Sequence, residues 1–502
     1  MKRLALILMA LVALGCALAA PAGASDVATA PDGTVTLVSG QQYLRVAPDG
    51  TRTPFQDYTL RETEEEGDPS VAVAPDGTAT VAWVRIGPVG SAVLVRRIGP
   101  DGELEGGVTE LVSHSEDSHL NPDVAVAPDG TATVVWTATF GGETFIQSSR
   151  IAPDGTAGKR VDLAAGGSYS PDVEVAPDGT ATVVWHQFGD DSSTAAARQI
   201  KPDGSLDDAL QLSSGACNSQ DPALAVTPSG AAVVVWECIY PHGVGVDPDE
   251  ILEERRIAPN GVPDKGVNTI SAEEDAGAPV VAAGPDGTVT IVWRQSAGPM
   301  LERRIEPDGT PEDTIYDVSS PARGIYPKLA IADDGSATLV WSTGWQIFSR
   351  RLDPDGAPAG PLREVLSSNG YMNMLGMGFD PEDGSALPIW SRRLGYYETE
   401  SALEASRLAA DGTAGPIFYL TDPGTEPATW ADPGSLAFGD VKIGTTVTSQ
   451  VEFTNRSVDS TPVSGVYLQG ADADQFQIVD AGSCTSQPIP FVSTCSVTVA
   501  FT

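Results

Sequence analysis

The sequence predicts an all-β fold, and three observations support this prediction. A segment of sixteen residues recurs almost unchanged, as NPDVAVAPDGTATVVW at 121–136 and as SPDVEVAPDGTATVVW at 170–185. The apolar segments are short, rich in Val, Ile, Thr and Trp, and interrupted by Pro-Asp-Gly, which is the pattern of β-strands joined by hairpin turns. The sequence lacks the apolar period of three to four residues that is typical of amphipathic helices.

Looser copies of this segment continue along the chain, and each contains two turns that end in glycine. The first turn glycines are Gly33, Gly77, Gly130, Gly179, Gly230, Gly287, Gly335 and Gly384. The second turn glycines are Gly50, Gly102, Gly155, Gly204, Gly261, Gly309, Gly356 and Gly412. Six residues after the first glycine stands Ser39 in the first copy and a tryptophan in the others: Trp83, Trp136, Trp185, Trp236, Trp293, Trp341 and Trp390. Successive tryptophans lie 48 to 57 residues apart, a period that fits one four-stranded blade of a β-propeller.

Each copy reads as four strands, which in the third copy are DVAVA, TATVVW, FIQSSRIA and KRVDLA. In the turn A-P-D-G-T, proline presets the first turn angle, aspartate tolerates the second position and glycine adopts the left-handed conformation. A blade is apolar on both faces, so it must pack between neighbours until the ring closes, with the tryptophan filling the wedge between blades. We therefore predict an eight-bladed β-propeller of four-stranded antiparallel blades over residues 25–422, in repeats of about 50 residues. Seven blades are the alternative, because the first copy is short and carries Ser39 instead of tryptophan.

The N-terminus has the pattern of a bacterial export signal. Two basic residues precede the apolar segment LALILMALVALG, which is too short to span a bilayer, and Ala22-Gly23-Ala24 offers a cleavage site. We therefore expect residues 1–24 to be a signal peptide, cleaved near Ala24, and the protein to be secreted or displayed on the cell surface of a bacterium. The motif ALGC, which ends at Cys16, resembles a lipoprotein box, so lipidation of Cys16 is the alternative. We expect no transmembrane segment in the mature chain.

Cysteine content and charge agree with export. Removal of the signal leaves four cysteines, for which the local pairs Cys217–Cys238 and Cys484–Cys495 are the natural disulfides in an oxidising compartment. The net charge is −39, from 68 acidic and 29 basic residues. Nucleic acid and anionic membrane surfaces are therefore excluded as partners, because both require a concentrated basic patch.

A second module follows a Pro/Gly-rich linker at residues 423–434. Its segments LAFGDVKIGTTVTSQVEFTN, VSGVYLQGADADQF and CSVTVAF carry a set of spaced matches: Phe438-Gly439, Val441, Gly444, Asn455, Gly470, Phe476 and the Cys484/Cys495 pair. On these residues the module, at 435–502, resembles the choice-of-anchor D or ASH-type immunoglobulin-like domain. The resemblance implies a small β-sandwich in a surface-associated protein. That family normally continues with a proline and a final strand, so we expect a truncated domain. A truncated domain would leave one strand edge open, through which the module could associate with another molecule.

The repeats also carry a resemblance, through the pattern P-x-V-A-V-x-x-x-G-x-A-x-V-V-W followed by R-R-I-x-x-x-G. They resemble an uncharacterised class of bacterial exported β-propeller repeat proteins and are more distantly similar to the WD40-like repeats of periplasmic TolB-type proteins. The resemblance implies the architecture and says almost nothing about activity, because propellers host many unrelated functions.

Three residue patterns look chemical, and for each we prefer a structural interpretation. Aspartate precedes the glycine in fourteen of the sixteen turns, where turn formation rather than metal binding explains it. Arginine lies five residues before the second glycine in seven copies, where we expect stacking and ion pairing within blades; these are Arg45, Arg97, Arg150, Arg256, Arg304, Arg351 and Arg407. His114 and His119 lie among acidic residues in SHSEDSHLNPD, which we interpret as a solvated loop because zinc-ligand spacing is absent. We therefore predict no catalytic residue, no metal and no cofactor.

The strand order places the connections of each blade on two different faces of the ring. The connections from first to second and from third to fourth strand are the short glycine turns, and we call their side the short-turn face. The other connections vary in length and chemistry; their side is the variable-loop face, and variable loops on a rigid scaffold are where ligands usually bind. The predicted ligand-binding residues, at the channel mouth and in these loops, are Asp68, Asn121, Asp123, Ser170, Asp172, Asp221, Tyr326, His242, Tyr396 and Tyr397.

These observations predict an exported or cell-surface, non-catalytic binding or structural protein that holds its ligand, an extracellular protein or a glycan, on the variable-loop face. The alternative is a propeller hydrolase or lyase that acts on extracellular polysaccharide through carboxylates at the channel mouth. The two differ in one requirement, since glycoside hydrolysis needs two carboxylates about 5–10 Å apart in a deep pocket.

Overall fold

The structure is a computed structural model of the whole chain. It describes residues 25–59, 65–87, 90–114, 118–189, 192–240, 249–271, 275–296, 298–368, 370–393, 401–420, 429–432, 445–455, 476–480, 484 and 494–501. Every regular element among these residues is a β-strand, which confirms the all-β prediction. The strands form nine antiparallel sheets of four strands each.

The first eight sheets follow one another along the chain, and each contains four consecutive strands. Those of the first four sheets are β1 (Ser25–Thr29), β2 (Val35–Ser39), β3 (Gln42–Val46), β4 (Gln56–Asp57), β5 (Glu65–Val73), β6 (Ala79–Gly87), β7 (Gly90–Ile98), β8 (Leu104–His114), β9 (Ser118–Val126), β10 (Ala132–Phe140), β11 (Glu143–Ile151), β12 (Val161–Ala165), β13 (Ser168–Val175), β14 (Ala181–Phe188), β15 (Ser193–Ile200) and β16 (Leu210–Gln211).

The next four sheets repeat this order, and the short first copy, with Ser39, also forms a complete sheet. Their strands are β17 (Asn218–Val226), β18 (Ala232–Tyr240), β19 (Asp249–Ile257), β20 (Asn268–Thr269), β21 (Ala276–Ala283), β22 (Val289–Gln295), β23 (Met300–Ile305), β24 (Tyr316–Asp317), β25 (Ile325–Ile331), β26 (Ala337–Ser342), β27 (Gln346–Leu352), β28 (Pro358–Ser367), β29 (Met372–Phe379), β30 (Ala386–Arg393), β31 (Ser401–Leu408) and β32 (Ala414–Tyr419).

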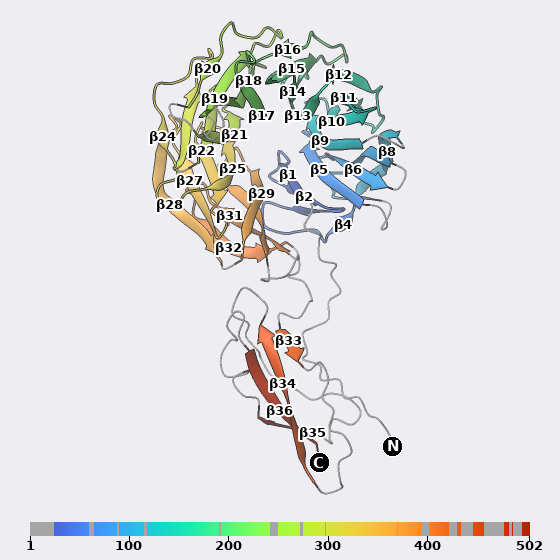
Figure 1. Cartoon of the computed structure of the whole chain (residues 1–502), viewed down its shortest axis with the longest axis vertical. Coiled ribbons are helices and arrows are strands. Elements are labelled where there is room, and N and C mark those ends of the chain that lie inside the picture. Colours follow the sequence, from blue (N-terminus) through green and yellow to red (C-terminus); the bar gives the residue numbers. More distant parts are fainter. Residues whose placement is uncertain are drawn as a thin grey trace.

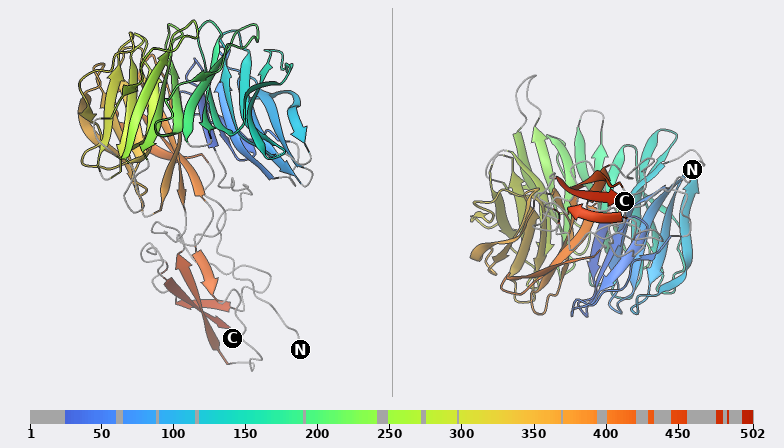
Figure 2. Two further views of the ribbon diagram at one scale, coloured as in Figure 1. Left: turned by 45° about the horizontal axis from the view of Figure 1, so that its top comes forward. Right: turned by 90° about the horizontal axis from the view of Figure 1, so that it is seen from below.

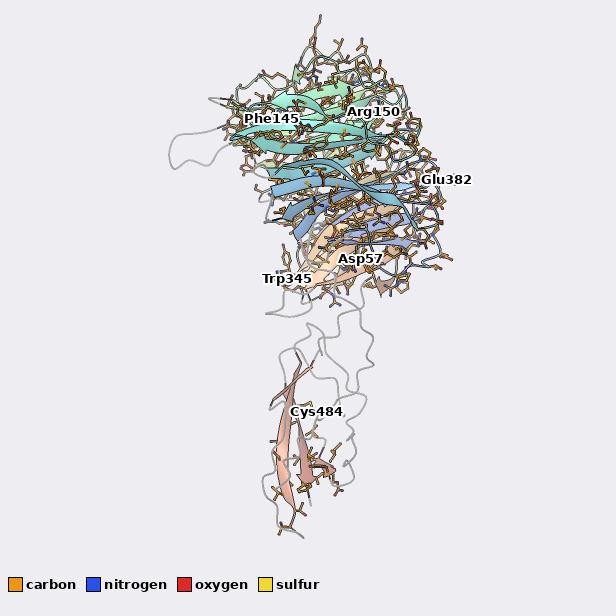
Figure 3. All side chains as sticks on the ribbon, turned by 90° about the vertical axis from the view of Figure 1, so that its right-hand side faces the viewer. Asp57, Phe145, Arg150, Trp345, Glu382 and Cys484 are labelled. Atoms are coloured by element: carbon orange, nitrogen blue, oxygen red, sulfur yellow. A yellow bond between two sulfur atoms is a disulfide. The ribbon has the colours of Figure 1, made fainter. Side chains whose placement is uncertain are left out.

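The eight sheets stand in a circle around a central axis, with the first strand of each innermost (Figures 1 and 2). The two classes of connection lie on opposite sides of this ring. In Figure 3, Trp345 and Phe145, beside connections from second to third strand, lie on one side, and Arg150 and Glu382, beside glycine turns, lie on the other. All sixteen turn glycines have positive φ, as the turn chemistry predicts.

The hydrophobic core lies between sheets rather than within one. Trp83, for example, is fully buried and packs with Val38 and Tyr43 of the first sheet. Equivalent clusters fill each junction between consecutive sheets. The predicted blade tryptophans are all at most 2% exposed, so they are the wedges between sheets that the repeat requires.

The ring closes between the eighth sheet and the first. A cluster that includes Leu37 of β2 and Ile389 of β30 fills this junction, and the Phe379 amide donates a hydrogen bond to Thr29 Oγ1 at 3.0 Å. On β29, Gly376 and Gly378 face Val27 and Val35 so closely that a Cβ atom at either glycine would overlap the valine side chain. Glycine at these two positions therefore lets the last inner strand approach the first.

The ninth sheet comprises β33 (Thr429–Asp432), β34 (Val447–Asn455), β35 (Phe476–Asp480) and β36 (Thr494–Phe501), in the order β33-β34-β36-β35. It lies outside the ring (Figure 1). Its Cys484–Cys495 disulfide and the Cys217–Cys238 disulfide of the ring both confirm the predicted pairing. The predicted signal peptide, with Cys16, and most of the linker lie outside the described residues.

The described residues include no helix of the length and apolarity that a membrane crossing needs.

Candidate functional site

A β-bulge with an unusual backbone conformation marks the start of the inner strand in six consecutive sheets. In each bulge the residue before proline has positive φ: Asp68 (50°), Asn121 (50°), Ser170 (50°), Asp221 (43°), Ala278 (52°) and Tyr326 (54°). The pairing with the second strand shifts at the same place, for example between Gly67 and Ser70. A non-glycine residue in this region carries a cost of about 1–2 kcal/mol, which the bulge imposes at every copy. Five of the predicted ligand-binding residues thus share one exposed ring of positions.

The other two predicted carboxylates, Asp123 and Asp172, lie one step deeper, just after the proline. Asp123 accepts hydrogen bonds from the Val173 amide at 2.8 Å and from Ser70 Oγ at 2.9 Å. Burial raises the pKa of Asp123 to about 6. Burial first, and then the negative charge of Asp123, raises the pKa of Asp172 well above its ordinary value. The structure therefore brings these two side chains together, in an environment that favours their protonated forms.

Two further carboxylates, Asp26 and Glu174, belong to the same group, although they were not among the predicted site residues. The Val71 amide donates to Asp26 at 2.8 Å, and the Val226 amide donates to Glu174 at 2.6 Å. Burial raises the pKa of both, to about 7 for Glu174. The signal was available in the repeat, because Asp26 stands seven residues before its turn glycine, as Asp123 and Asp172 do. We call Asp26, Asp123, Asp172 and Glu174 the channel carboxylates.

These carboxylates have a structural task. The inner strand of a blade has one edge without a partner strand, so its amides need acceptors from elsewhere. Asp26, Asp123 and Glu174 each supply an acceptor to the inner strand of the next sheet along the chain. The repeat position that the alternative hypothesis assigns to catalysis is therefore occupied by hydrogen bonds that join sheets.

One lysine stands in the same register. Lys328 of β25 lies seven residues before its turn glycine, where other sheets have Asp26, Asp123 or Asp172. Burial lowers the pKa of Lys328, and the negative charge of Asp26 opposes this shift. The position seven residues before the first turn glycine thus carries a carboxyl group in three sheets and the amine of Lys328 in one.

The arginines of the repeat make the predicted contacts within blades, as Arg256 does with Asp264 at 3.9 Å, and several also reach the neighbouring sheet, which was not predicted. Arg45 donates to Gly99 O at 2.8 Å and to Gly77 O at 3.0 Å, both in the second sheet. Arg150 of the third sheet donates to Lys201 O of the fourth at 3.0 Å. Arg407 of the eighth donates to Ala47 O of the first at 3.1 Å. The reason is length, since the guanidinium group extends past its own strand to the turn carbonyls of the neighbour. Contacts within a blade also occur, as between Arg97 and Glu105 at 3.3 Å.

The turn aspartates act as predicted. In all fourteen turns the carboxylate accepts a hydrogen bond from the amide two residues later, as Asp76 does from Thr78 at 2.9 Å. This bond is the main reason that the pKa of Asp76 and of Asp129 is lowered. Asn260 makes the same contact at 3.2 Å, which confirms that turn formation explains the pattern.

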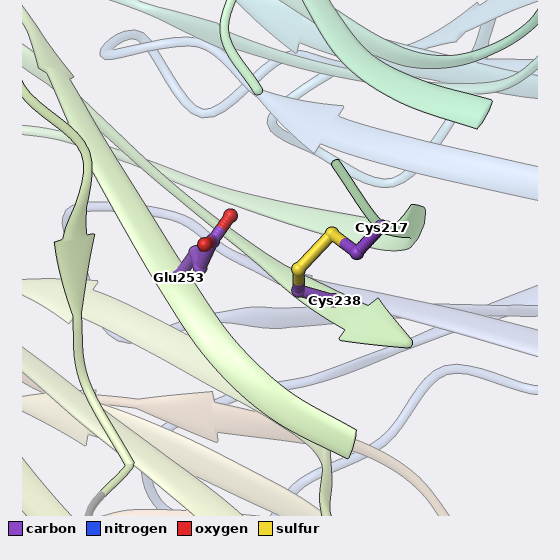
Figure 4. A group of neighbouring side chains, drawn as sticks. All are labelled: Cys217, Cys238 and Glu253. Atoms are coloured by element: carbon purple, nitrogen blue, oxygen red, sulfur yellow. A yellow bond between two sulfur atoms is a disulfide. The ribbon is translucent and has the colours of Figure 1, made fainter. Parts of the chain in front are cut away.

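The described residues contain one group with metal-ligand atoms close together: Cys217, Cys238 and Glu253, within 4.8 Å of one another. Both sulfur atoms belong to the disulfide (Figure 4), and Glu253 accepts a hydrogen bond from Trp236 Nε1 at 3.1 Å. The group is therefore occupied by covalent and hydrogen bonds.

A cavity of about 580 Å³ opens around the axis on the short-turn face. Its lining is the last residue of several inner strands and the proline of the turn that follows, for example Val73 and Pro75. The inner strands therefore carry carboxyl groups along their length and apolar side chains at their ends near the short turns.

Exposed aromatic side chains gather on the variable-loop face, and Tyr326 is the one among those described that the sequence analysis identified. Trp345 lies beside Tyr371, with ring centroids 5.7 Å apart, and Tyr169 lies beside Phe188, with centroids 5.5 Å apart. The sequence could have indicated Trp345, because this tryptophan does not stand at the repeat position that the blade tryptophans occupy. Among the other predicted loop residues, His242, Tyr396 and Tyr397 lie outside the described residues, as do the side chains of His114 and His119.

A closed ring of radial four-stranded sheets is a β-propeller (Figure 1). No protein-family model and no curated protein matches the chain. Solved structures that it resembles include the Dos1 propeller, with 9% identity, a TM-score of 0.48 and coverage of 74% of this chain and 90% of that one. A prolyl endopeptidase gives 12% identity and a TM-score of 0.46 over 80% of this chain, which spans only 56% of that protein. The Penicillium chrysogenum α-L-arabinanase complexed with arabinobiose gives 15% identity and a TM-score of 0.37, over 62% and 96%.

Proposed function

We propose that the protein is an exported, non-catalytic binding or structural protein: an eight-bladed propeller that holds its ligand on the variable-loop face. The secreted or cell-surface location rests on the export signal, and the two disulfides agree with it. The C-terminal module, with its likeness to choice-of-anchor D domains, serves as a spacer or association domain.

One observation carries the non-catalytic part of this proposal. Asp123, which a polysaccharide hydrolase would use at the channel mouth, already accepts hydrogen bonds from two neighbouring sheets. Asp172 belongs to the same buried group, where burial first and then the negative charge of Asp123 raise its pKa. The two carboxylates of a glycosidase must instead face a bound sugar, about 5–10 Å apart.

The alternative, a hydrolase or lyase acting on extracellular polysaccharide, has one observation in its favour. The raised pKa values of Asp123 and Glu174 keep protons available near neutral pH, which is the property of a general acid. The same values follow from burial alone, so the observation does not require catalysis.

The test is turnover by the mature chain. We expect incubation with soluble polysaccharides to release no new reducing ends. Turnover that disappears in the double variant Asp123→Asn/Asp172→Asn, and persists in Asp129→Asn on the short-turn face, would replace this proposal with the alternative. Asparagine suits the control because Asn260 already fills an equivalent turn position.

A further inference from the structure

Trp345 stands at the tip of the hairpin between β26 and β27, with 53% of its side chain exposed. The blade tryptophans of the ring are all buried, so the repeat gives no reason for this one. A single exposed aromatic residue needs no explanation, but several that gather into one patch on a rigid scaffold mark a binding surface.

Two more rings extend the surface across two sheets. Tyr371, just before β29, meets Trp345 edge to face, at an interplanar angle of 89°. Tyr326, in the bulge of β25, is 52% exposed, and after burial it is the next cause of the raised pKa of Tyr371. We call Tyr326, Trp345 and Tyr371 the Trp345 platform.

Hydrogen bonds hold this platform in place before any ligand arrives. The Met372 amide donates to Gly344 O at 2.7 Å, and the Ser368 amide donates to Trp345 O at 3.0 Å. Ser342 Oγ donates to Met372 O at 2.7 Å and accepts from the Gly344 amide at 2.8 Å. Gly344 has φ +92°, and a Cβ atom there would lie 2.8 Å from the Tyr371 ring. A preformed surface of this kind loses little conformational entropy on binding.

A second aromatic group stands in the fourth sheet, separated from the seventh by two sheets of the ring. Phe188 is 51% exposed and Tyr169 is 38% exposed, with their rings edge to face. His186 packs on Phe188 at a centroid distance of 4.3 Å. Between the two groups, the bulge of the fifth sheet presents the exposed Asp221 to solvent, and the bulge of the sixth presents the small Ala278.

This arrangement matches one kind of ligand. An aromatic face attracts the polarised C–H groups on the apolar side of a sugar ring, while side-chain oxygens bind its hydroxyl groups. A chain of sugars offers both features repeatedly along its length, whereas a protein partner needs a continuous covered area of about 800 Å² on this side. The exposed carboxylates of this face, such as Asp68 and Asp221, repel an anionic chain.

Building on the function proposed above, we propose that the ligand is a neutral extracellular polysaccharide, stacked on the Trp345 platform and extended across the variable-loop face toward Phe188.

The test measures retardation of the mature chain in native gels that contain a neutral α-glucan, β-glucan or β-mannan, with alginate as the anionic comparison. We expect retardation by at least one neutral polymer and none by alginate. Trp345→Ala should weaken that binding at least tenfold, and Phe188→Ala should weaken binding of the polymer more than that of a short oligosaccharide.

Val262→Ala is the matched control, because Val262 is 57% exposed in a glycine turn, on the opposite face. Its binding should equal that of the unmodified protein, and unchanged melting temperatures should show that all variants fold. Absence of retardation by every neutral polymer would overturn the inference, as would unchanged binding by Trp345→Ala or preference for alginate.

The outcomes separate the two proposals. Cross-linking of position 345 to a cell-surface protein, without polysaccharide binding, would refute the glycan and leave a binding function. Release of reducing ends in the same samples would refute the non-catalytic function instead.

Discussion

The turn aspartates and the channel carboxylates carry the same chemical group, yet their pKa values shift in opposite directions. At Asp129, on the exposed short-turn face, the hydrogen bond from the Thr131 amide is the largest influence and lowers the pKa. At Asp123, six residues earlier in the sequence, burial outweighs the hydrogen bonds and raises the pKa to about 6. Both accept amide hydrogen bonds, so the difference lies in solvation. One repeat can therefore use aspartate as a surface turn residue and as an acid between sheets.

The largest expected effect on stability comes from removing a blade tryptophan, because the packing between sheets buries Asp123 and so raises its pKa. Trp136→Ala should destabilise the protein by about 3–5 kcal/mol, because it empties the wedge between the second and third sheets. Urea unfolding measures this cost. If burial sets the pKa of Asp123, NMR titration of the variant should give a value closer to 3.8. An unchanged pKa would show that another influence is responsible.

A smaller loss of stability should distinguish the buried acceptor Asp123 from the exposed acceptor Asp129. Asp123→Ala removes the acceptor for Val173 and Ser70 and should cost about 1–3 kcal/mol at pH 5. Asp129→Ala, whose amide partner can bond to water, should cost less. Asp123→Asn keeps an acceptor oxygen and should recover most of the loss. Equal costs for the two alanine variants, in chemical denaturation, would contradict the comparison.

The dependence of stability on pH should show the channel carboxylates and the turn aspartates in one experiment. The folded-state pKa of Asp123, about 6, and of Glu174, about 7, exceed the unfolded values near 4, so folding binds protons and stability rises as pH falls from about 7 toward 4. The turn aspartates have lowered pKa values, so their contribution is lost as pH falls further below 4. Melting temperature should therefore peak in mildly acidic solution. The variant Asp123→Asn/Glu174→Gln should flatten the rise on the alkaline side of that peak.

The smallest effect is expected at the turns. Asp129→Asn should leave stability near neutral pH almost unchanged, because Asn260 makes the same contact in its own turn. Only the loss of stability below pH 4 should become slightly shallower. A large destabilisation, measured by thermal melting at pH 7, would show that the negative charge of Asp129 itself stabilises the turn on the short-turn face.

The repeat made most of the fold predictable, because its information is local. Turn glycines, strand lengths and the buried tryptophans all follow from short stretches of sequence. The channel carboxylates were only partly foreseen: Asp123 and Asp172 were, but their amide partners lie in another sheet about 50 residues away. The reach of Arg45 into the second sheet was missed for the same reason. The Trp345 platform joins residues of the seventh and eighth sheets, and variable loops carry no periodic signal that would pair them.

The junction between Phe379 and Thr29 has a consequence for how such rings change. Each sheet of the ring is made of four consecutive strands, so the seam joins two finished sheets and divides neither. A chain cut in any variable loop and rejoined at its old ends would keep every strand ladder intact, and circular permutants should fold. By the same logic, duplication or deletion of a whole repeat would divide no strand ladder, which gives the architecture an easy route to rings of another size.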